Sequence, residues 1–288
     1  MKKCIWIAVL FISTCFNIYA QQPYIDLLGV EYYRLPAGTS YSGDNKLTTS
    51  WFKASIQAPI KIKEDYLIIQ PSYEQYTFDK SVTFPGNLYG ISLPLTYIRQ
   101  WNNKQWQTAF VVIPRISAEL QPVPEDGYQL GGAVVAIYKK RQDLDYKFGV
   151  YYNSEFFGPF IIPLAGIDWK INDRFTLFGL LPLSLNLEYK LGKNIYAGVA
   201  IYTVTNSYRL SNHDWIKIAD NHLKLFLNYY ISGNLVLISE AGFSILRKYT
   251  YGSGYGNNDI EINLQYKDGP IFKVGIAWRI RLDEAKAN

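Results

Sequence analysis

The sequence has little charge, two cysteines and no long apolar run beyond its first twenty residues. Charged residues make up 18% of the 288 residues, below the roughly 25% typical of soluble domains. Outside the first twenty residues no stretch reaches the about 18 uncharged apolar residues of a membrane helix. Gly and Pro interrupt the two longest candidates, FFGPFIIPLAGI and FTLFGLLPLSLNL. Helical membrane spans are therefore excluded, and the surface carries unusually little charge.

The first twenty residues, MKKCIWIAVLFISTCFNIYA, are typical of a secretory signal peptide. Two lysines precede an apolar run from Ile5 to Cys15, and the small residue Ala20 precedes QQPY. We predict that residues 1–20 are cleaved, which leaves residues 21–288 without cysteine. The competing prediction is a lipoprotein signal at Cys15, but Thr14 before it is bulkier than the small residue favoured there.

Aromatic residues make up 16% of the chain and include 25 tyrosines. Fourteen segments show alternating apolar and polar residues, or β-branched and aromatic enrichment, between turn residues. They are 25–35, 47–60, 66–78, 88–100, 105–119, 128–139, 145–153, 159–171, 174–181, 183–191, 195–209, 217–231, 234–248 and 270–282. The alternation alone fits a soluble β-sandwich equally well. The even strand number and the export signal favour an all-β transmembrane antiparallel up-and-down β-barrel of about 14 strands, with 12 as the alternative count.

The connections between these segments alternate in length. Tight turns read KEDY, NNK, INDR, GKN and SGN, whereas longer connections read PAGTSYSGDN, FDKSVTFPGN, QPVPEDG and LSNHDWI, together with residues 249–269. Outer-membrane barrels have short turns on the periplasmic side and long loops outside. A soluble sandwich gives no reason for this sorting, so the barrel is preferred.

Alternation also assigns the two faces of each strand. One face of residues 223–231 carries Leu223, Leu225, Leu227, Tyr229 and Ile231 and is predicted to meet lipid. The opposite faces carry the lumen-facing candidates Arg115, Glu119, Asp168, Lys170, Glu188, Lys190, Lys224, Glu240, Lys273, Arg279 and Arg281. Aromatic residues near strand ends are predicted to form interface girdles: Tyr24, Trp51, Trp101, Trp106, Tyr128, Tyr138 and Trp169.

Six prolines oppose the barrel, because they fall in predicted strands and a closed wall has no edge that tolerates a missing N–H. They are Pro59, Pro71, Pro94, Pro114, Pro163 and Pro182. Pairs of them flank three successive tight turns at similar distances. We therefore hypothesise a belt of bulges or strand ends at one level of the wall, far from the turns.

Residues 166–200, GIDWKINDRFTLFGLLPLSLNLEYKLGKNIYAGVA, together with the strand series and the export signal, carry a resemblance. The chain resembles an uncharacterised family of outer-membrane β-barrels known only as a domain of unknown function. The resemblance covers essentially all of residues 21–288. It implies a fold and an outer-membrane location and transfers no catalytic or binding residue. The ending DEAKAN after Leu282 departs from the aromatic last residue usual in such barrels.

Few residues suggest chemistry. His213 beside Asp214 and His222 could activate water or a hydroxyl, but no nucleophile motif accompanies them. The glycines of GSGYG at 252–256 lack the strand and helix of a phosphate-binding loop. We expect no catalytic site, metal or cofactor.

The leading hypothesis is a narrow passive channel for small solutes. The alternatives are a non-transporting barrel whose outer loops bind a partner, and a lipid-modifying enzyme that uses His213 or His222. Expected partners are outer-membrane lipid, the barrel-assembly machinery and small solutes. No basic run suited to phosphates is present, so nucleic acid is not expected.

Overall fold

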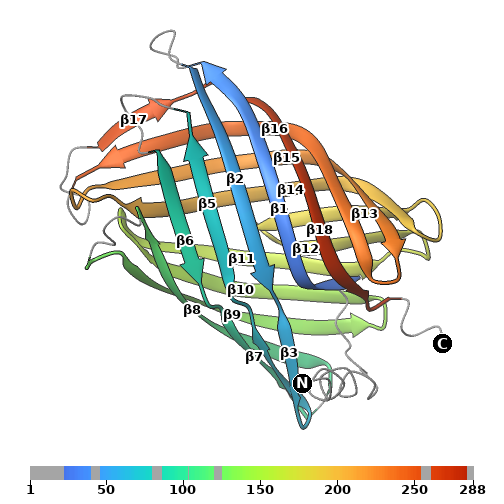
Figure 1. Cartoon of the computed structure of the whole chain (residues 1–288). Coiled ribbons are helices and arrows are strands. Elements are labelled where there is room, and N and C mark those ends of the chain that lie inside the picture. Colours follow the sequence, from blue (N-terminus) through green and yellow to red (C-terminus); the bar gives the residue numbers. More distant parts are fainter. Residues whose placement is uncertain are drawn as a thin grey trace, which may run out of the picture.

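A computed structural model describes residues 23–39, 46–79, 86–102, 104–119, 125–253 and 261–283. In these residues one sheet curls into a barrel (Figure 1). Its strands are β1 (Tyr24–Thr39), β2 (Lys46–Ile56), β3 (Ala58–Ile62), β4 (Asp65–Ile69), β5 (Ser72–Phe78), β6 (Asn87–Ser92), β7 (Leu95–Gln100), β8 (Trp106–Ala118), β9 (Tyr128–Arg141), β10 (Leu144–Glu155), β11 (Gly158–Lys170), β12 (Phe175–Leu181), β13 (Ser184–Lys190), β14 (Ile195–Arg209), β15 (Trp215–Ser232), β16 (Leu235–Gly252), β17 (Glu261–Gln265) and β18 (Gly269–Arg281). Within the described ranges, no helix is long and apolar enough to span a membrane. The predicted signal peptide lies outside these ranges.

The sheet is closed by its first and last strands. β1 pairs antiparallel with β18 from Tyr24, opposite Arg281, to Arg34, opposite Phe272. Three barrel strands are interrupted, so that each consists of two labelled segments: β2 and β3, β4 and β5, and β6 and β7. Among the described residues, β17 pairs with the outer end of β16 alone. Counted in this way, the wall is a closed antiparallel barrel of 14 strands, as the sequence predicts.

The outer surface of the wall is apolar and its inner surface is polar. Leu225 is 65% exposed and Phe148 55%, whereas Asp168 and Glu188 are 3% and 2% exposed. This arrangement is the reverse of a soluble protein, in which apolar side chains fill the interior. It follows from strict alternation, because successive side chains of a strand point to opposite faces.

Three of the six prolines lie at one level on neighbouring strands, where the ladder continues through their carbonyls. Ile56 N donates to Pro71 O at 3.0 Å, Gln70 N to Pro94 O at 2.9 Å, and Leu93 N to Pro114 O at 3.0 Å. Pro71 and Pro94 also mark the interruptions between β4 and β5 and between β6 and β7. Pro182 instead lies in the β12–β13 turn, where no strand hydrogen bond is lost.

The hairpin of β12 and β13 reaches only about half the height of the wall. The β11–β12 ladder stops where Ala165 faces Leu181, and the β13–β14 ladder stops where Ser184 faces Tyr202. The outer halves of β11 and β14 therefore have no strand between them. The predicted sorting of loop lengths fails here, because the outer connections at 156–157 and 182–183 are as short as the tight turns.

A second correction concerns residues 249–269, predicted to be one long loop. β16 continues to Gly252, and β17 pairs with it from Lys248, opposite Gln265, to Gly252, opposite Glu261. Residues 254–260, which include part of GSGYG, lie outside the described residues. Residues 249–252 and 261–265 extend the wall at its outer end, defined here as the end that carries the 210–214 connection.

Candidate functional site

A group of ion pairs joins four strands inside the barrel. Lys273 Nζ on β18 lies 2.9 Å from Glu31 Oε1 on β1 and 2.6 Å from Glu240 Oε1 on β16. Glu240 Oε2 also lies 2.5 Å from Lys224 Nζ on β15. Both ammonium groups lie over the ring of Tyr33, at 5.3 and 5.5 Å. Each buried charge thus has an opposite partner, as buried charges require.

Nearer the tight turns, two arginines of β18 extend into the lumen. Arg279 forms two hydrogen bonds to Asp26, at 2.5 and 2.8 Å, and stacks on Tyr24 at 3.5 Å. Arg281 Nη2 lies 2.7 Å from Glu188 Oε1 on β13. Three strands, β14, β15 and β16, separate β13 from β18 in the wall, so this pair spans part of the lumen. These contacts narrow the inner end.

A polar cluster ties β14 to β8, β9 and β10 in the outer half. Arg115 Nη1 donates to Asn206 Oδ1 at 2.8 Å, and its Nη2 donates to Gln129 Oε1 at 2.6 Å. Gln129 Nε2 donates to Ser207 Oγ at 3.1 Å, and Ser207 N donates to Glu155 Oε2 at 2.9 Å. The outer part of β14 is therefore held against strands that lie well away from it in the sheet order.

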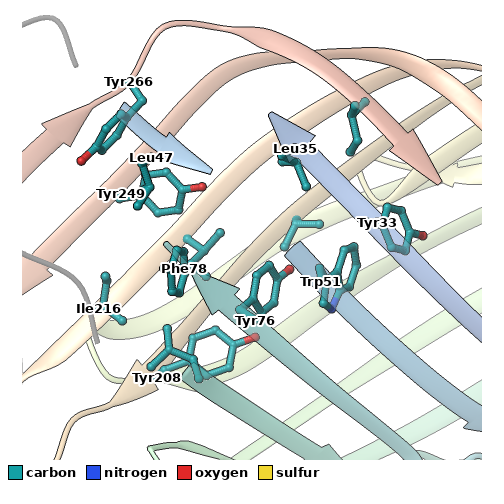
Figure 2. Close-up of a cluster of buried hydrophobic side chains, with 14 of the residues drawn as sticks. Tyr33, Leu35, Leu47, Trp51, Tyr76, Phe78, Tyr208, Ile216, Tyr249 and Tyr266 are labelled. Atoms are coloured by element: carbon teal, nitrogen blue, oxygen red, sulfur yellow. The ribbon is translucent and has the colours of Figure 1, made fainter. Parts of the chain in front are cut away.

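Stacked aromatic side chains occupy the lumen toward the outer end (Figure 2). The Trp51 ring lies 4.4 Å from Tyr33 and 5.1 Å from Tyr76, both in stacked geometry. Tyr76 stacks on Phe78 at 6.3 Å and meets Tyr208 edge-on at 5.8 Å. We call Tyr33, Trp51, Tyr76, Phe78 and Tyr208 the aromatic layer. It spans the lumen from β1, β2 and β5 to β14 and forms its apolar constriction.

The lumen-facing candidates divide into two groups. Those that lie inside the barrel with a charged partner, all buried except the part-buried Arg115 and Glu240, are Arg115, Asp168, Glu188, Lys224, Glu240, Lys273, Arg279 and Arg281. The others lie at the ends of the wall. Glu119 follows β8 and accepts a hydrogen bond from Ser211 N, Lys170 is exposed beside the 171–174 turn, and Lys190 lies over Tyr196 near the tight turns.

Glu119 and Lys170 lie at the ends of the wall, and their lumen-facing role stays a prediction. Alternation places both side chains on the lumen side of their strands. Strand pairing ends beside them, however, so each side chain contacts a loop. Lys170 Nζ lies 3.0 Å from Asp173 in the tight turn. A hydrogen bond from Lys170, with its charge, lowers the pKa of Asp173.

Two of the predicted interface aromatics lie inside the barrel. Trp51 is 2% exposed within the aromatic layer, and Tyr24 lies beneath Arg279. Trp101 and Tyr128, by contrast, are 47% and 66% exposed. Parity would have placed Trp51 correctly, because it lies two residues before Lys53 and so shares the face of a charged side chain, whose Nζ lies 6.0 Å from the Trp51 ring.

The two histidines do not form one site. His222 Nε2 lies 3.2 Å from Asp220 in the lumen, and its side chain is 2% exposed. His213 is in the 210–214 connection, 71% exposed and 3.3 Å from Asp126. Within the described ranges, no group of three His, Cys, Asp or Glu residues could hold a metal ion.

The closed 14-strand wall, apolar outside and charged inside, defines an outer-membrane type of β-barrel. The chain belongs to the family described as a domain of unknown function, DUF6268, whose sequence model matches residues 33–279. No curated protein matches the chain.

Several solved barrels are similar to the chain. An outer-membrane channel from Pseudomonas putida F1 is 9% identical, with a TM-score of 0.46, over 88% of this chain and 94% of that one. The NanC porin is 9% identical, with a TM-score of 0.43, over 88% and 100%. The Pseudomonas putida toluene transporter TodX is 9% identical, with a TM-score of 0.35, over 90% and 89%. The function proposed below rests on this chain's own residues.

Proposed function

We propose that this barrel is a narrow passive channel for small solutes in the outer membrane. The observation that carries the proposal is the set of charged side chains that point from the closed wall into the lumen. Barrels of about 8 strands are filled by their own side chains, and those of 16 to 18 hold open channels. Fourteen strands give an intermediate lumen, in which side chains decide what passes.

Two constrictions set the properties of this channel. The aromatic layer forms an apolar restriction toward the outer end, and the Arg279 and Arg281 contacts form a charged one toward the tight turns. Lysines and carboxylates alternate between them, so neither sign of charge dominates. We infer modest selectivity, because pore-lining charge and diameter together decide which solutes pass.

The same proposal includes export and membrane insertion. Residues 1–20 would direct export and be removed, and residues 21–288 would insert through the barrel-assembly machinery into lipid. The apolar outer surface supports this, because exposed side chains such as Leu225 and Phe148 suit hydrocarbon better than water.

Planar bilayers test the channel directly. Purified protein should give discrete conductance steps, and Trp51→Ala should enlarge them because it removes the central ring of the aromatic layer. Trp101→Ala is the matched control, since Trp101 is exposed on the barrel and contacts Thr108. Absence of conductance in the unmodified protein and in Trp51→Ala, with both folded, would refute the proposal.

A further inference from the structure

Strand pairing has a gap between the outer halves of β11 and β14, which we call the window. Its two sides are Gly158–Leu164 of β11 and Thr203–Asn206 of β14. The β12–β13 turn closes it toward the inner end, where Thr203 N donates to Leu183 O at 3.0 Å. Toward the outer end Ser207 closes it, because Ser207 Oγ accepts from Phe156 N at 2.9 Å.

The size of the window follows from strand geometry. Strands rise about 3.3 Å per residue, so four residues of β14 span about 13 Å and seven residues of β11 about 23 Å. Where the hairpin ends, two strands are missing from between β11 and β14. Three strand spacings of about 4.8 Å would separate the backbones by about 14 Å there. This is a distance between backbones, and the side chains of β11 and β14 take up part of it, so the window admits small molecules at most.

Proline blunts the edge of β11 along the window. Lys170 N donates to Asp143 O on the β9–β10 side, so the odd-numbered residues of β11 direct their N–H groups toward β12 and the window. Pro159 and Pro163 are odd-numbered, and proline has no N–H. The edge therefore cannot form a regular ladder with an added strand. This argues against a docking site for another strand.

The lumen side behind the window is apolar, unlike the ion-paired inner faces of β1, β15, β16 and β18. Leu164 is 4% exposed and clusters with Ala109 and Val135, and Ile162 and Leu183 pack against the same cluster. Tyr151 and Phe160 extend this surface, with their rings 6.4 Å apart. A polar solute gains nothing from such a surface, whereas an apolar one is stabilised by leaving water.

The window opens at the level of the apolar outer surface. Ile161, at its edge, is 63% exposed, and Val150 on the next strand is 52% exposed. The opposite side of the window carries Thr203 and Thr205, both part-exposed, and the Thr203 hydroxyl donates to Asn221 Oδ1 on β15 at 3.0 Å. An arriving molecule would therefore come from the membrane and cross one apolar and one hydroxyl-bearing side.

We propose that the window is a lateral portal through which small apolar molecules pass between the membrane and the apolar lumen surface at Leu164. This inference rests on the proposed channel function and names a route and a solute class for it. No covalent step is involved. The apolar cluster at Leu164 lies between two ion pairs, Arg115–Glu155 toward the outer end and Lys147–Asp168 toward the inner end.

Thiol labelling tests this route, because both cysteines of the sequence lie within residues 1–20. Leu164→Cys places a single thiol behind the window, and Ala277→Cys places one at a buried lumen position on β18, 3% exposed. Both proteins, in phosphatidylcholine vesicles, are treated with membrane-soluble N-phenylmaleimide and with a charged methanethiosulfonate. For each variant, the labelling rate with N-phenylmaleimide is divided by the rate with the charged reagent. We expect this ratio to be about tenfold higher for Leu164→Cys than for Ala277→Cys, a difference of about 1.4 kcal/mol in barrier.

A blocking variant separates the portal from the lumen. Leu183→Trp enlarges the side chain at the inner border of the window and should remove most of the preference, whereas Leu187→Trp, on the outside of the same hairpin, should retain it. Ile162→Cys repeats the measurement if Leu164→Cys fails to fold. Equal normalised rates at Leu164→Cys and Ala277→Cys, or no effect of Leu183→Trp, would overturn the portal. Conductance of the same samples tests the channel separately, so the two proposals can fail independently.

Discussion

The face assignment of β15 gives a sharp prediction for Leu225→Arg. Leu225 is 65% exposed, and it faces Val199 on β14, which in turn faces Leu187 on β13. These three side chains form one apolar row around the outside of the wall. An arginine in this row would have to bury its charge in hydrocarbon or distort the lipid around it.

The depth of Leu225 sets the expected cost. It lies six residues before Ile231, which adjoins the tight turn after β15, so the strand path between them is about 20 Å. A tilt of about 40° turns this path into about 15 Å of height, close to the middle of an apolar band about 25 Å tall. Arginine at the midplane costs about 2 to 4 kcal/mol, falling to about 0 to 1 near the interface.

The measurement is reversible denaturant unfolding in lipid vesicles, followed by tryptophan fluorescence. Leu225→Arg should lose about 2 to 4 kcal/mol of unfolding free energy. Ile231→Arg is the matched control, since it carries the same substitution on the same face and strand near the interface. Equal losses for both variants would show that Leu225 does not lie deep in lipid and would refute the orientation of the wall.

Two further predictions concern the interior. Arg281→Met should cost about 3 to 5 kcal/mol of unfolding free energy because it leaves the buried Glu188 carboxylate without its partner. Removal of the exposed Arg141 side chain should cost only about 0 to 1 kcal/mol. Similar losses for the two variants would contradict the buried pairing. Gly198→Ala should cost about 1 to 3 kcal/mol, because its Cβ would lie 2.1 Å from a carbonyl oxygen of the neighbouring strand. Gly192→Ala, with nothing within 4 Å, should be neutral in the same unfolding assay, and equal effects would argue against that close approach.

The strand number and the inner and outer faces could be predicted because both depend on local alternation. Residues 223–231 show this clearly, since every second side chain is apolar and exposed. Alternation along a strand predicts which face each residue occupies, but it does not predict the residue at which the strand stops pairing with its neighbour. Glu119 and Lys170 illustrate this, as each lies just where pairing stops.

Contacts across the lumen could not be predicted from alternation. The aromatic layer joins Tyr33, Trp51 and Tyr76 with Tyr208, which comes more than 130 residues after Tyr76 in the chain. Alternation alone would direct these rings inward. Aromatic residues near strand ends are also common at the membrane interface, however, and that second rule wrongly assigns Trp51 to the interface. The half-height of β12 and β13 likewise depends on register, which short apolar runs leave unspecified.

The half-height hairpin also bears on how barrels of this kind change size during evolution. Antiparallel walls gain or lose strands in pairs, because an odd change would move one chain end to the other side of the membrane. β12 and β13 form such a pair. Beyond them, Glu155 at the end of β10 already bonds Ser207 of β14. Loss of residues 171–194 would leave β11 next to β14 and would give a 12-strand wall. The hydrogen bond between Ser207 and Glu155 would already join the outer ends of the strands on either side of the loss.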